Sequence, residues 1–286
     1  MKYGIISDIH SNIQALKQAL KDLDGQVDEI VCNGDIVGYN ANPRECIDLV
    51  KDNGKITHII QGNHDIDAAC FNDLSMDQLR SLSSDAYVGI KYSSSLLLDE
   101  DRDWLKSLPL DFKVKDKDFP FWISHYSPNQ CTYFGYILYL HDARDSFKML
   151  KEWEGSNVFF FGHSHIPSFI EMDEDGSISF QTGNDVIDVD FEIKDNHYYL
   201  INPGSIGQPR VMGLTSYAIF DTKEKTLVIK ELEYNIEEAQ KAINDAGYSQ
   251  SIARRLSYDV ESKKRAKKER CKQRQKQRNL DSQKKI

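Results

Sequence analysis

Seven side chains in this sequence combine oxygen and imidazole nitrogen donors at recurrent short spacings. Asp8 and His10 stand two residues apart, as do His163 and His165. Side chains two residues apart in extended backbone point to the same side, so each pair can hold one centre. The full set is Asp8, His10, Asp35, Asn63, His125, His163 and His165.

The donor types limit which ions this set can hold. Imidazole nitrogen with carboxylate or amide oxygen, and no thiolate, suits Mn, Fe or Zn and is poor for Ca or for a cysteine-type zinc site. Seven ligands exceed what one ion accepts, whereas a shared carboxylate can hold two ions about 4 Å apart, the arrangement used for displacement at phosphorus. The set therefore predicts a centre of two divalent ions.

Buried strands must position these side chains. Apolar runs at 2–8, 28–35 and 55–63 predict strands, and helices are predicted over 13–23, where apolar residues recur at helical spacing, and over 43–51, where proline stands near the start. The resulting order of strand, helix, strand, helix and strand predicts parallel pairing.

The rest of the chain predicts further strands and a second sheet. A mostly helical stretch over about 65–107 is followed by strands at 119–125 and 157–163, with a helix near 142–151 between them. Short strands at 166–172, 177–182, 198–201, 216–221 and 226–233 then predict a second, more antiparallel sheet packed on the first. Five donors stand at or just past the carboxyl end of a predicted strand, where open α/β sheets bind ligands: Asp8, Asp35, Asn63, His125 and His163.

Charge is distributed unevenly along the 286 residues. Residues 261–286 hold twelve Lys and Arg against three acids, so this tail carries +9 and residues 1–260 carry −18, which together make the net charge of −9. An acidic body repels a nucleic acid backbone, so affinity for a polyanion must come from the tail or from bound cations. The tail itself is compatible with a solvated helix, a disordered arm or a polyanion-binding element. No apolar stretch is long enough for a membrane span, and we expect a cytoplasmic protein.

Five sequence blocks together resemble the calcineurin-like metallophosphoesterase family. They are D-x-H at 8–10, G-D at 34–35, G-N-H-D at 62–65, a later histidine at 125, and G-H-S-H at 162–165, in family order. Within the family, "GDIVGYNANPREC", "LPL", "SHYSP" and "NPGSIGQPR" resemble the small bacterial and archaeal branch of phosphodiesterases and diadenosine tetraphosphatase-like enzymes. The resemblance implies an α/β fold of two packed mixed β-sheets flanked by helices, a four-layer α/β/β/α sandwich. We expect this domain over 1–248 and a basic, helical extension over 249–286.

The resemblance also implies roles for the donors. Asp8, His10, Asp35 and His165 would bind one metal, with Asp35 bridging, while Asn63, His125 and His163 complete the other; Mn is favoured among Mn, Fe and Zn. A hydroxide between the ions would attack phosphorus, and His64 would protonate the leaving group. Asp65 either orients the His64 ring or caps the helix that follows.

Three further residues are expected to bind substrate. Arg210 has a planar guanidinium that matches phosphate oxygens, Asn12 can add a donor, and Tyr39 either lines the pocket or shields its rim. Protein Ser/Thr phosphatases of the family carry an aspartate and an arginine where Gly38 and Tyr39 stand here, which argues against a phosphoprotein substrate. It also leaves the orientation of His64 to some other group.

Together these features predict a metal-dependent phosphoric ester hydrolase. Its expected substrates are small phosphomonoesters or phosphodiesters, nucleotides included, with diadenosine polyphosphate cleavage as one alternative and a non-catalytic scaffold of the same fold as another. No membrane partner is expected, nucleic acid binding through the tail stays open, and the sequence does not indicate an oligomeric state.

Overall fold

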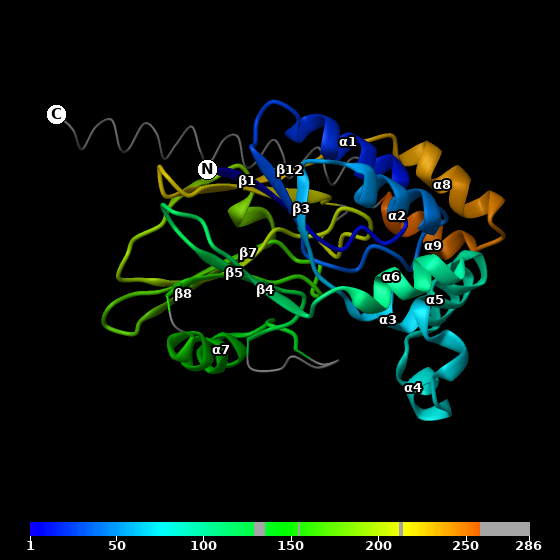
Figure 1. Ribbon diagram of the computed structural model, residues 1–286, viewed down its shortest axis with the longest axis horizontal. Coiled ribbons are helices and arrows are strands. Elements are labelled where there is room, and N and C mark those ends of the chain that lie inside the picture. Colours follow the sequence, from blue (N-terminus) through cyan, green and yellow to red (C-terminus); the bar gives the residue numbers. More distant parts are fainter. Residues whose placement is uncertain (129–134, 154, 212–213, 258–286) are drawn as a thin grey trace.

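The computed structural model describes residues 1–128, 135–153, 155–211 and 214–257 (Figure 1). In chain order its elements are β1 (Lys2–Ile6), α1 (Ile13–Leu23), β2 (Glu29–Cys32), α2 (Pro43–Asp52), β3 (Ile56–Ile59), α3 (Asn63–Ala69), the 3-10 helix η1 (Phe71–Asp73), α4 (Met76–Ser81), α5 (Ser84–Leu96), α6 (Asp99–Ser107), β4 (Asp111–Val114), β5 (Phe121–Ser124), α7 (Leu140–Glu152), β6 (Val158–Phe160), β7 (Ser168–Met172), β8 (Ile178–Thr182), the 3-10 helix η2 (Gly183–Val186), β9 (Asp190–Glu192), β10 (Tyr198–Asn202), β11 (Ser216–Asp221), β12 (Thr226–Glu231), α8 (Ile236–Asp245) and α9 (Gln250–Leu256).

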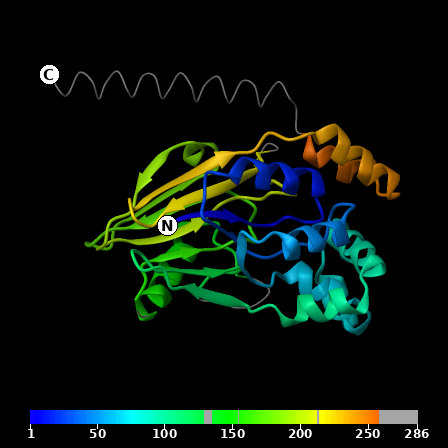
Figure 2. The same cartoon turned by 45° about the horizontal axis from the view of Figure 1, so that its top comes forward.

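The strands form two six-stranded mixed sheets. Their orders are β3-β2-β1-β11-β12-β9 and β4-β5-β6-β10-β7-β8. As predicted, β1, β2 and β3 pair in parallel. The expected division of strands between the sheets is wrong in part, because β11 joins the first sheet antiparallel to β1 while β5 and β6 belong to the second. Figure 2 shows the late yellow strands beside the blue β1. Local patterns do not reveal which strand edges pair across two hundred residues.

Alternating burial explains how the layers stack. Neighbouring residues of a strand face opposite sides of its sheet. Ile6 joins the core beneath α1 and α2, while Ile5 joins the core between the sheets. In the second sheet, Phe160 faces this central core and Phe159 packs with α7 on the outside. The four-layer α/β/β/α sandwich is therefore confirmed, with α1 and α7 on opposite outer faces (Figure 1).

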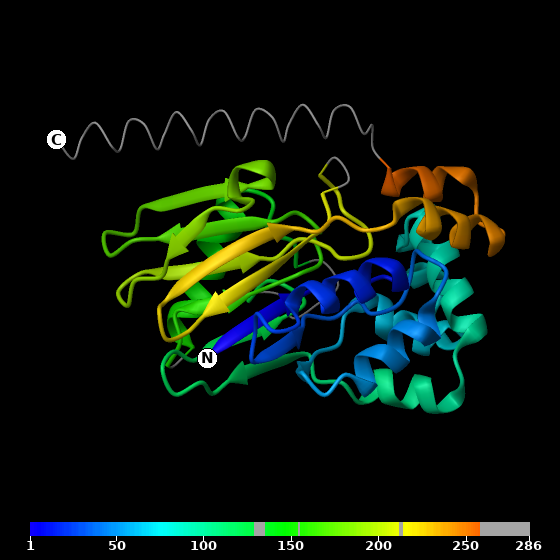
Figure 3. The ribbon, with the colours of Figure 1, turned by 90° about the horizontal axis from the view of Figure 1, so that it is seen from above.

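The two C-terminal helices of the described chain pack on the body. Ile243 of α8 and Ile252 and Leu256 of α9 are buried in one small apolar cluster, and Figure 3 shows the orange helices side by side. Residues 250–256, which fall inside the expected extension, thus pack against the domain. The charged tail at 261–286 lies outside the described residues, and the domain division stays a prediction.

Two short strands escape sequence patterns. β4 and β9 have four and three residues and lie at the edges of the two sheets. Each mixes charged and aromatic residues, which is typical of sheet edges but too short for a periodic signal. Among the described helices, none has the length and apolar content that crossing a membrane requires.

Candidate metal centre

The predicted donors gather at one end of the two packed sheets, where the strands named below have their carboxyl ends. Asp8, Asp35 and Asn63 follow β1, β2 and β3 of the first sheet. His125 and His163 follow β5 and β6 of the second sheet. Because carboxyl ends of parallel strands meet at one edge of a sheet, five loops from two sheets converge. The structure thus brings together residues separated by more than one hundred positions.

The backbone at this edge is strained. Left-handed φ angles occur at Asp8 (54°), His10 (47°), Asp35 (54°), His163 (64°) and His165 (57°). Such conformations cost roughly 1–3 kcal/mol each in residues other than glycine, and they cluster at functional sites. Here the strain turns each chain sharply after its strand, which aims the side chains inward.

One cluster contains four of the donors. Ligand atoms of Asp8, His10, Asp35 and His165 all lie within 4.8 Å of one another. His10 Nε2 is 3.0 Å from His165 Nε2 and 3.5 Å from Asp35 Oδ2. His165 Nε2 is 3.2 Å from Asp8 Oδ1. Two imidazoles and two carboxylates therefore surround a single point.

A second cluster shares Asp35. Its ligand atoms and those of His125 and His163 also lie within 4.8 Å of one another, and His125 Nε2 is 3.2 Å from Asp35 Oδ2. Asn63 begins α3 beside this cluster, because the amide of the following residue, His64, donates to Asp35 Oδ1 at 2.8 Å. Asp35 is thus the member common to both groups.

Backbone carbonyls orient three of the rings. His10 Nδ1 lies 3.1 Å from the Val37 carbonyl oxygen, and His125 Nδ1 lies 2.8 Å from that of Asn33. His165 Nδ1 likewise contacts the carbonyl of Gln208. A carbonyl oxygen only accepts, so each Nδ1 must donate, and each Nε2 offers its lone pair when the ring is neutral. This is how metal-binding histidines are usually held.

Several inward atoms have no hydrogen bond within the described ranges. They are Asp35 Oδ2, Asn63 Oδ1, His125 Nε2 and His163 Nε2. Each belongs to a residue predicted as a ligand, and leaving buried polar atoms unpaired costs roughly 1–3 kcal/mol apiece. Four unpaired acceptors converging on one edge fit divalent cations, and so does a donor set of oxygen and imidazole nitrogen.

In the metal-free protein, the pKa values of these buried groups shift in different directions. Burial lowers the pKa of His10 and His165 well below the usual value and lowers that of His163 to about 3. Burial raises the pKa of Asp8 to about 7, with the Asp35 charge adding to the effect. For His125, burial acts downward, but the Asp35 charge outweighs it and raises the pKa to about 10.

His64 and Asp65 have separate tasks. Gly62 N donates to Asp65 Oδ2 at 3.0 Å, and Ile36 N and Val37 N donate to Oδ1 at 2.8 and 3.1 Å. Asp65 therefore caps α3 and ties it to the loop after β2, the second of its two expected roles. The His64 ring instead lies 4.7 Å, between centroids, from the His10 ring.

The expected substrate-binding residues lie in different surroundings. Asn12 Oδ1 accepts from Ala15 N at 3.1 Å, and its Nδ2 donates to the Gly207 carbonyl at 3.3 Å. Its amide thus has a structural use at the start of α1. Arg210 is exposed, and its Nη2 donates to the buried Tyr39 hydroxyl at 3.2 Å. Contact of these three residues with substrate stays a prediction.

One aromatic neighbour was missed by sequence reasoning. The Tyr136 ring stacks on the His163 ring at 4.0 Å between centroids with 23° between planes. Tyr136 is half exposed, at 44%, on the outer side of this ligand. It belongs to none of the sequence blocks and stands 27 positions away in the chain, so no local signal marked it.

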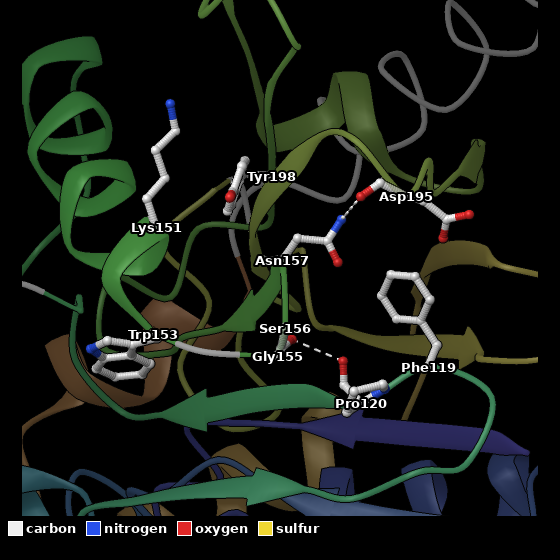
Figure 4. Close-up of a pocket in the computed structure, with 9 residues that line it drawn as sticks. All are labelled: Phe119, Pro120, Lys151, Trp153, Gly155, Ser156, Asn157, Asp195 and Tyr198. Atoms are coloured by element: carbon white, nitrogen blue, oxygen red, sulfur yellow. Dashed lines mark hydrogen bonds between the residues drawn. The ribbon is translucent and has the colours of Figure 1, made fainter.

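A second hollow, of about 340 Å³, lies at the opposite, amino ends of β5, β6 and β10 (Figure 4). Ser156 Oγ donates to the Pro120 carbonyl at 2.8 Å, and Asn157 Nδ2 donates to the carbonyls of Lys194 and Asp195 at 3.2 and 3.1 Å. These polar groups are thus satisfied by hydrogen bonds within the protein. They differ in this from the unpaired ligand atoms of the metal centre.

Two packed mixed sheets, with a buried Asp/His cluster beyond the carboxyl ends of strands from both, define a metallophosphoesterase type of architecture. The model of the calcineurin-like phosphoesterase superfamily domain matches residues 1–225. The chain belongs to this family.

Relatives agree with this assignment. The uncharacterized protein MJ0912 of Methanocaldococcus jannaschii is 34% identical over 244 residues, which cover 84% of this chain and 90% of that protein. The crystal structure of a metallophosphoesterase from Sphaerobacter thermophilus is similar with a TM-score of 0.71 and 31% identity, covering 91% of this chain and 99% of that one. The hypothetical protein PH1004 from Pyrococcus horikoshii shares the fold, with a TM-score of 0.70, 19% identity, and coverage of 90% and 98%.

Proposed function

We propose that this protein is a phosphoesterase that uses two divalent metal ions to hydrolyse small phosphomonoesters or phosphodiesters, nucleotides included. The observation that carries the proposal is the position of Asp35, whose carboxylate belongs to both clusters of buried ligand atoms. A carboxylate shared between two groups of imidazoles is the element that a two-ion centre needs. Ions held there would supply charge neutralisation at phosphorus and a water of lowered pKa.

The chain's own residues divide the remaining work. Arg210, which is exposed beside Tyr39, offers the fork of donors that suits phosphate oxygens. His64 gives a proton to the departing oxygen. Burial lowers the pKa of His64 to about 4, so the ring needs a nearby anion to hold its proton, and a bound phosphate group supplies that anion.

The test compares hydrolysis with metal content. Protein stripped of metal and reloaded with Mn²⁺ is assayed with bis-p-nitrophenyl phosphate and p-nitrophenyl phosphate, and bound metal is measured by elemental analysis. We expect turnover of at least one ester only in the loaded protein. The His141→Gln variant is the matched control, because that histidine is 74% exposed and outside both clusters.

Two outcomes would contradict the proposal. Bound metal without turnover of either ester would indicate a scaffold that keeps the fold and lacks the chemistry. Failure to bind two ions per chain would rule out the proposed centre of two metal ions. A screen of natural phosphoesters, with identification of nucleotide products, then narrows the substrate and decides whether diadenosine polyphosphates are cleaved.

A further inference from the structure

Within the described residues, no hydrogen bond to Nδ1 orients the ring of the proposed proton donor. His64 Nδ1 is buried and makes no hydrogen bond to any described residue. The nearest carboxylate in sequence, Asp65, is occupied by three backbone amides. Gly38 stands directly beneath the ring, since a Cβ there would lie 2.4 Å from His64 Nδ1. Ring packing is therefore the contact in the described chain that can set the direction of this imidazole.

Tyr39 packs on His64 more nearly face to face than His10 does. The two ring centroids are 4.6 Å apart with 35° between the planes. The same tyrosine ring meets the ring of His10 edge to face at 4.7 Å and 83°. Both Tyr39 and His64 are only 5% exposed. Tyr39 thus contacts the proton donor and a ligand of the metal centre at once.

Tyr39 is itself held firmly from the side of α5. Its φ of 52° is left-handed, which costs energy and requires surrounding support. Helix α5 supplies this support: Ser93 Oγ accepts from Gly38 N at 3.1 Å, and a Cβ on Gly89 would lie 2.3 Å from Tyr39 N. The backbone of the loop therefore rests directly on the helix.

Arg210 holds the other end of the tyrosine. Its Nη2 donates to the Tyr39 hydroxyl at 3.2 Å, and its guanidinium carbon is 5.8 Å from the ring centroid. Arg210 Nε also donates to Gln208 Oε1 at 2.9 Å. The guanidinium, the phenol ring and the imidazole form a continuous row that runs from exposed Arg210 to buried His64.

We propose that Tyr39 is the positioning residue for His64. Its ring face fixes the angle at which the imidazole meets the leaving group, and its hydroxyl keeps Arg210 at a set distance from that imidazole. The inference rests on the proposed function for its catalytic meaning, while the ring contact stands on geometry alone. A purely apolar face replaces the carboxylate partner that a proton-donating histidine often has.

Leaving-group dependence separates this role from a general loss of structure. A p-nitrophenolate departs without a proton, whereas an alkoxide needs one. In Tyr39→Leu we expect the ratio of p-nitrophenyl to alkyl ester turnover to rise at least about tenfold, since general acids contribute roughly 10²–10⁴-fold. Tyr39→Phe keeps the ring and recovers most of the alkyl ester turnover, with a raised KM because Arg210 loses its acceptor. Tyr87→Leu, a tyrosine on α5 that packs on Phe71, is the matched control with an unchanged ratio.

A spectroscopic readout tests the contact without any turnover. The NMR signals of the His64 ring protons are assigned in histidine-labelled protein by their loss in His64→Gln. They should show a ring-current shift from the Tyr39 ring. Tyr39→Phe should retain this shift and Tyr39→Leu should remove it. If the leucine variant does not fold, Gly38→Ala is the second variant: its added Cβ would lie 2.4 Å from His64 Nδ1 and displace the imidazole, so both the shift and the ester ratio should change. Bound metal should stay at the wild-type level in every variant.

The outcomes are distinguishable from those of the proposed function. An unchanged His64 shift in Tyr39→Leu would overturn the inference, and so would an equal loss for both esters accompanied by loss of metal. If the wild-type protein hydrolyses neither ester, the proposed function fails, while the ring shifts still decide whether Tyr39 positions His64.

Discussion

The two ends of β5 and β6 differ in how their polar groups are satisfied. At the carboxyl ends, the buried Nε2 atoms of His125 and His163 make no hydrogen bond within the described chain, and His163 has a left-handed φ. At the amino ends, Ser156 and Asn157 donate to backbone carbonyls around the hollow of Figure 4. The same two strands thus have a strained carboxyl end with unsatisfied polar groups and a relaxed amino end whose polar groups are hydrogen-bonded.

This difference teaches which buried polar groups indicate a ligand. A satisfied group closes a loop and contributes to stability, whereas an unsatisfied group in a strained turn lowers the stability of the ligand-free protein. Such costs persist at functional sites because the surrounding core compensates for them. Substitutions at the two ends should accordingly have opposite effects on stability and activity.

Replacement of the shared carboxylate should have the largest effect. We expect Asp35→Asn to lose metal from both clusters and more than roughly 10³-fold in turnover, because a bound ion supplies several kcal/mol of transition-state stabilisation. Elemental analysis and ester hydrolysis check this result. Asp195→Asn at the amino-end hollow, where the exposed carboxylate pairs with half-buried Lys225, is the matched control and should retain both metal and activity.

Removal of the proton donor should come next. His64→Ala should keep its metal and lose roughly 10²-fold or more of turnover on esters with alkyl leaving groups. The loss on p-nitrophenyl esters should be much smaller, since that leaving group needs no proton. Steady-state rates with both classes of ester measure the difference. An unchanged rate on alkyl esters would remove His64 from its assigned role.

The stability of the metal-free protein should depend on Asp8. Its folded pKa of about 7 exceeds the unfolded value near 4, so the folded state holds an extra proton in between and loses stability as pH rises from about 4 to about 7. Asp8→Asn removes this titration. At pH 8 the metal-free variant should be more stable than wild type by roughly 1–4 kcal/mol, with little difference at pH 4. Urea unfolding at both pH values measures this, and a less stable variant at pH 8 would contradict it.

The smallest effect is expected at the amino ends. Asn157→Ala should lower the free energy of unfolding by roughly 0.5–1.5 kcal/mol, because the exposed carbonyls of Lys194 and Asp195 exchange a protein donor for water. Metal content and ester turnover should not change. A loss of activity without a loss of stability would break the comparison between the two ends.

Sequence reasoning succeeded where the signal was local. The strands that precede Asp8, Asp35 and Asn63 are short apolar runs, and the polar residue after each one marks where the strand ends. It failed for the placement of β11, which pairs with β1 across more than two hundred residues. At that distance, which strands pair depends on how all the strands of the folded core fit together. A short window of sequence does not contain this information.

The candidate site divides in the same way. The type and order of the seven donors could be read from the chain, because metal chemistry restricts the ligands to a few residue types. The structural use of Asn12 and the stacking of Tyr136 on His163 could not be read, because both depend on partners distant in the chain.

Taken by itself, the sequence determined the donor set, the strands that present it and the resemblance to a family, since each follows from residue type and short spacing. The resemblance implied a bridging Asp35, but only the tertiary structure showed that its carboxylate lies within reach of both clusters and that Tyr39 packs on His64. The physical reason is that shared ligands and ring contacts are properties of side-chain packing, and packing is settled only when both sheets and α5 have come together.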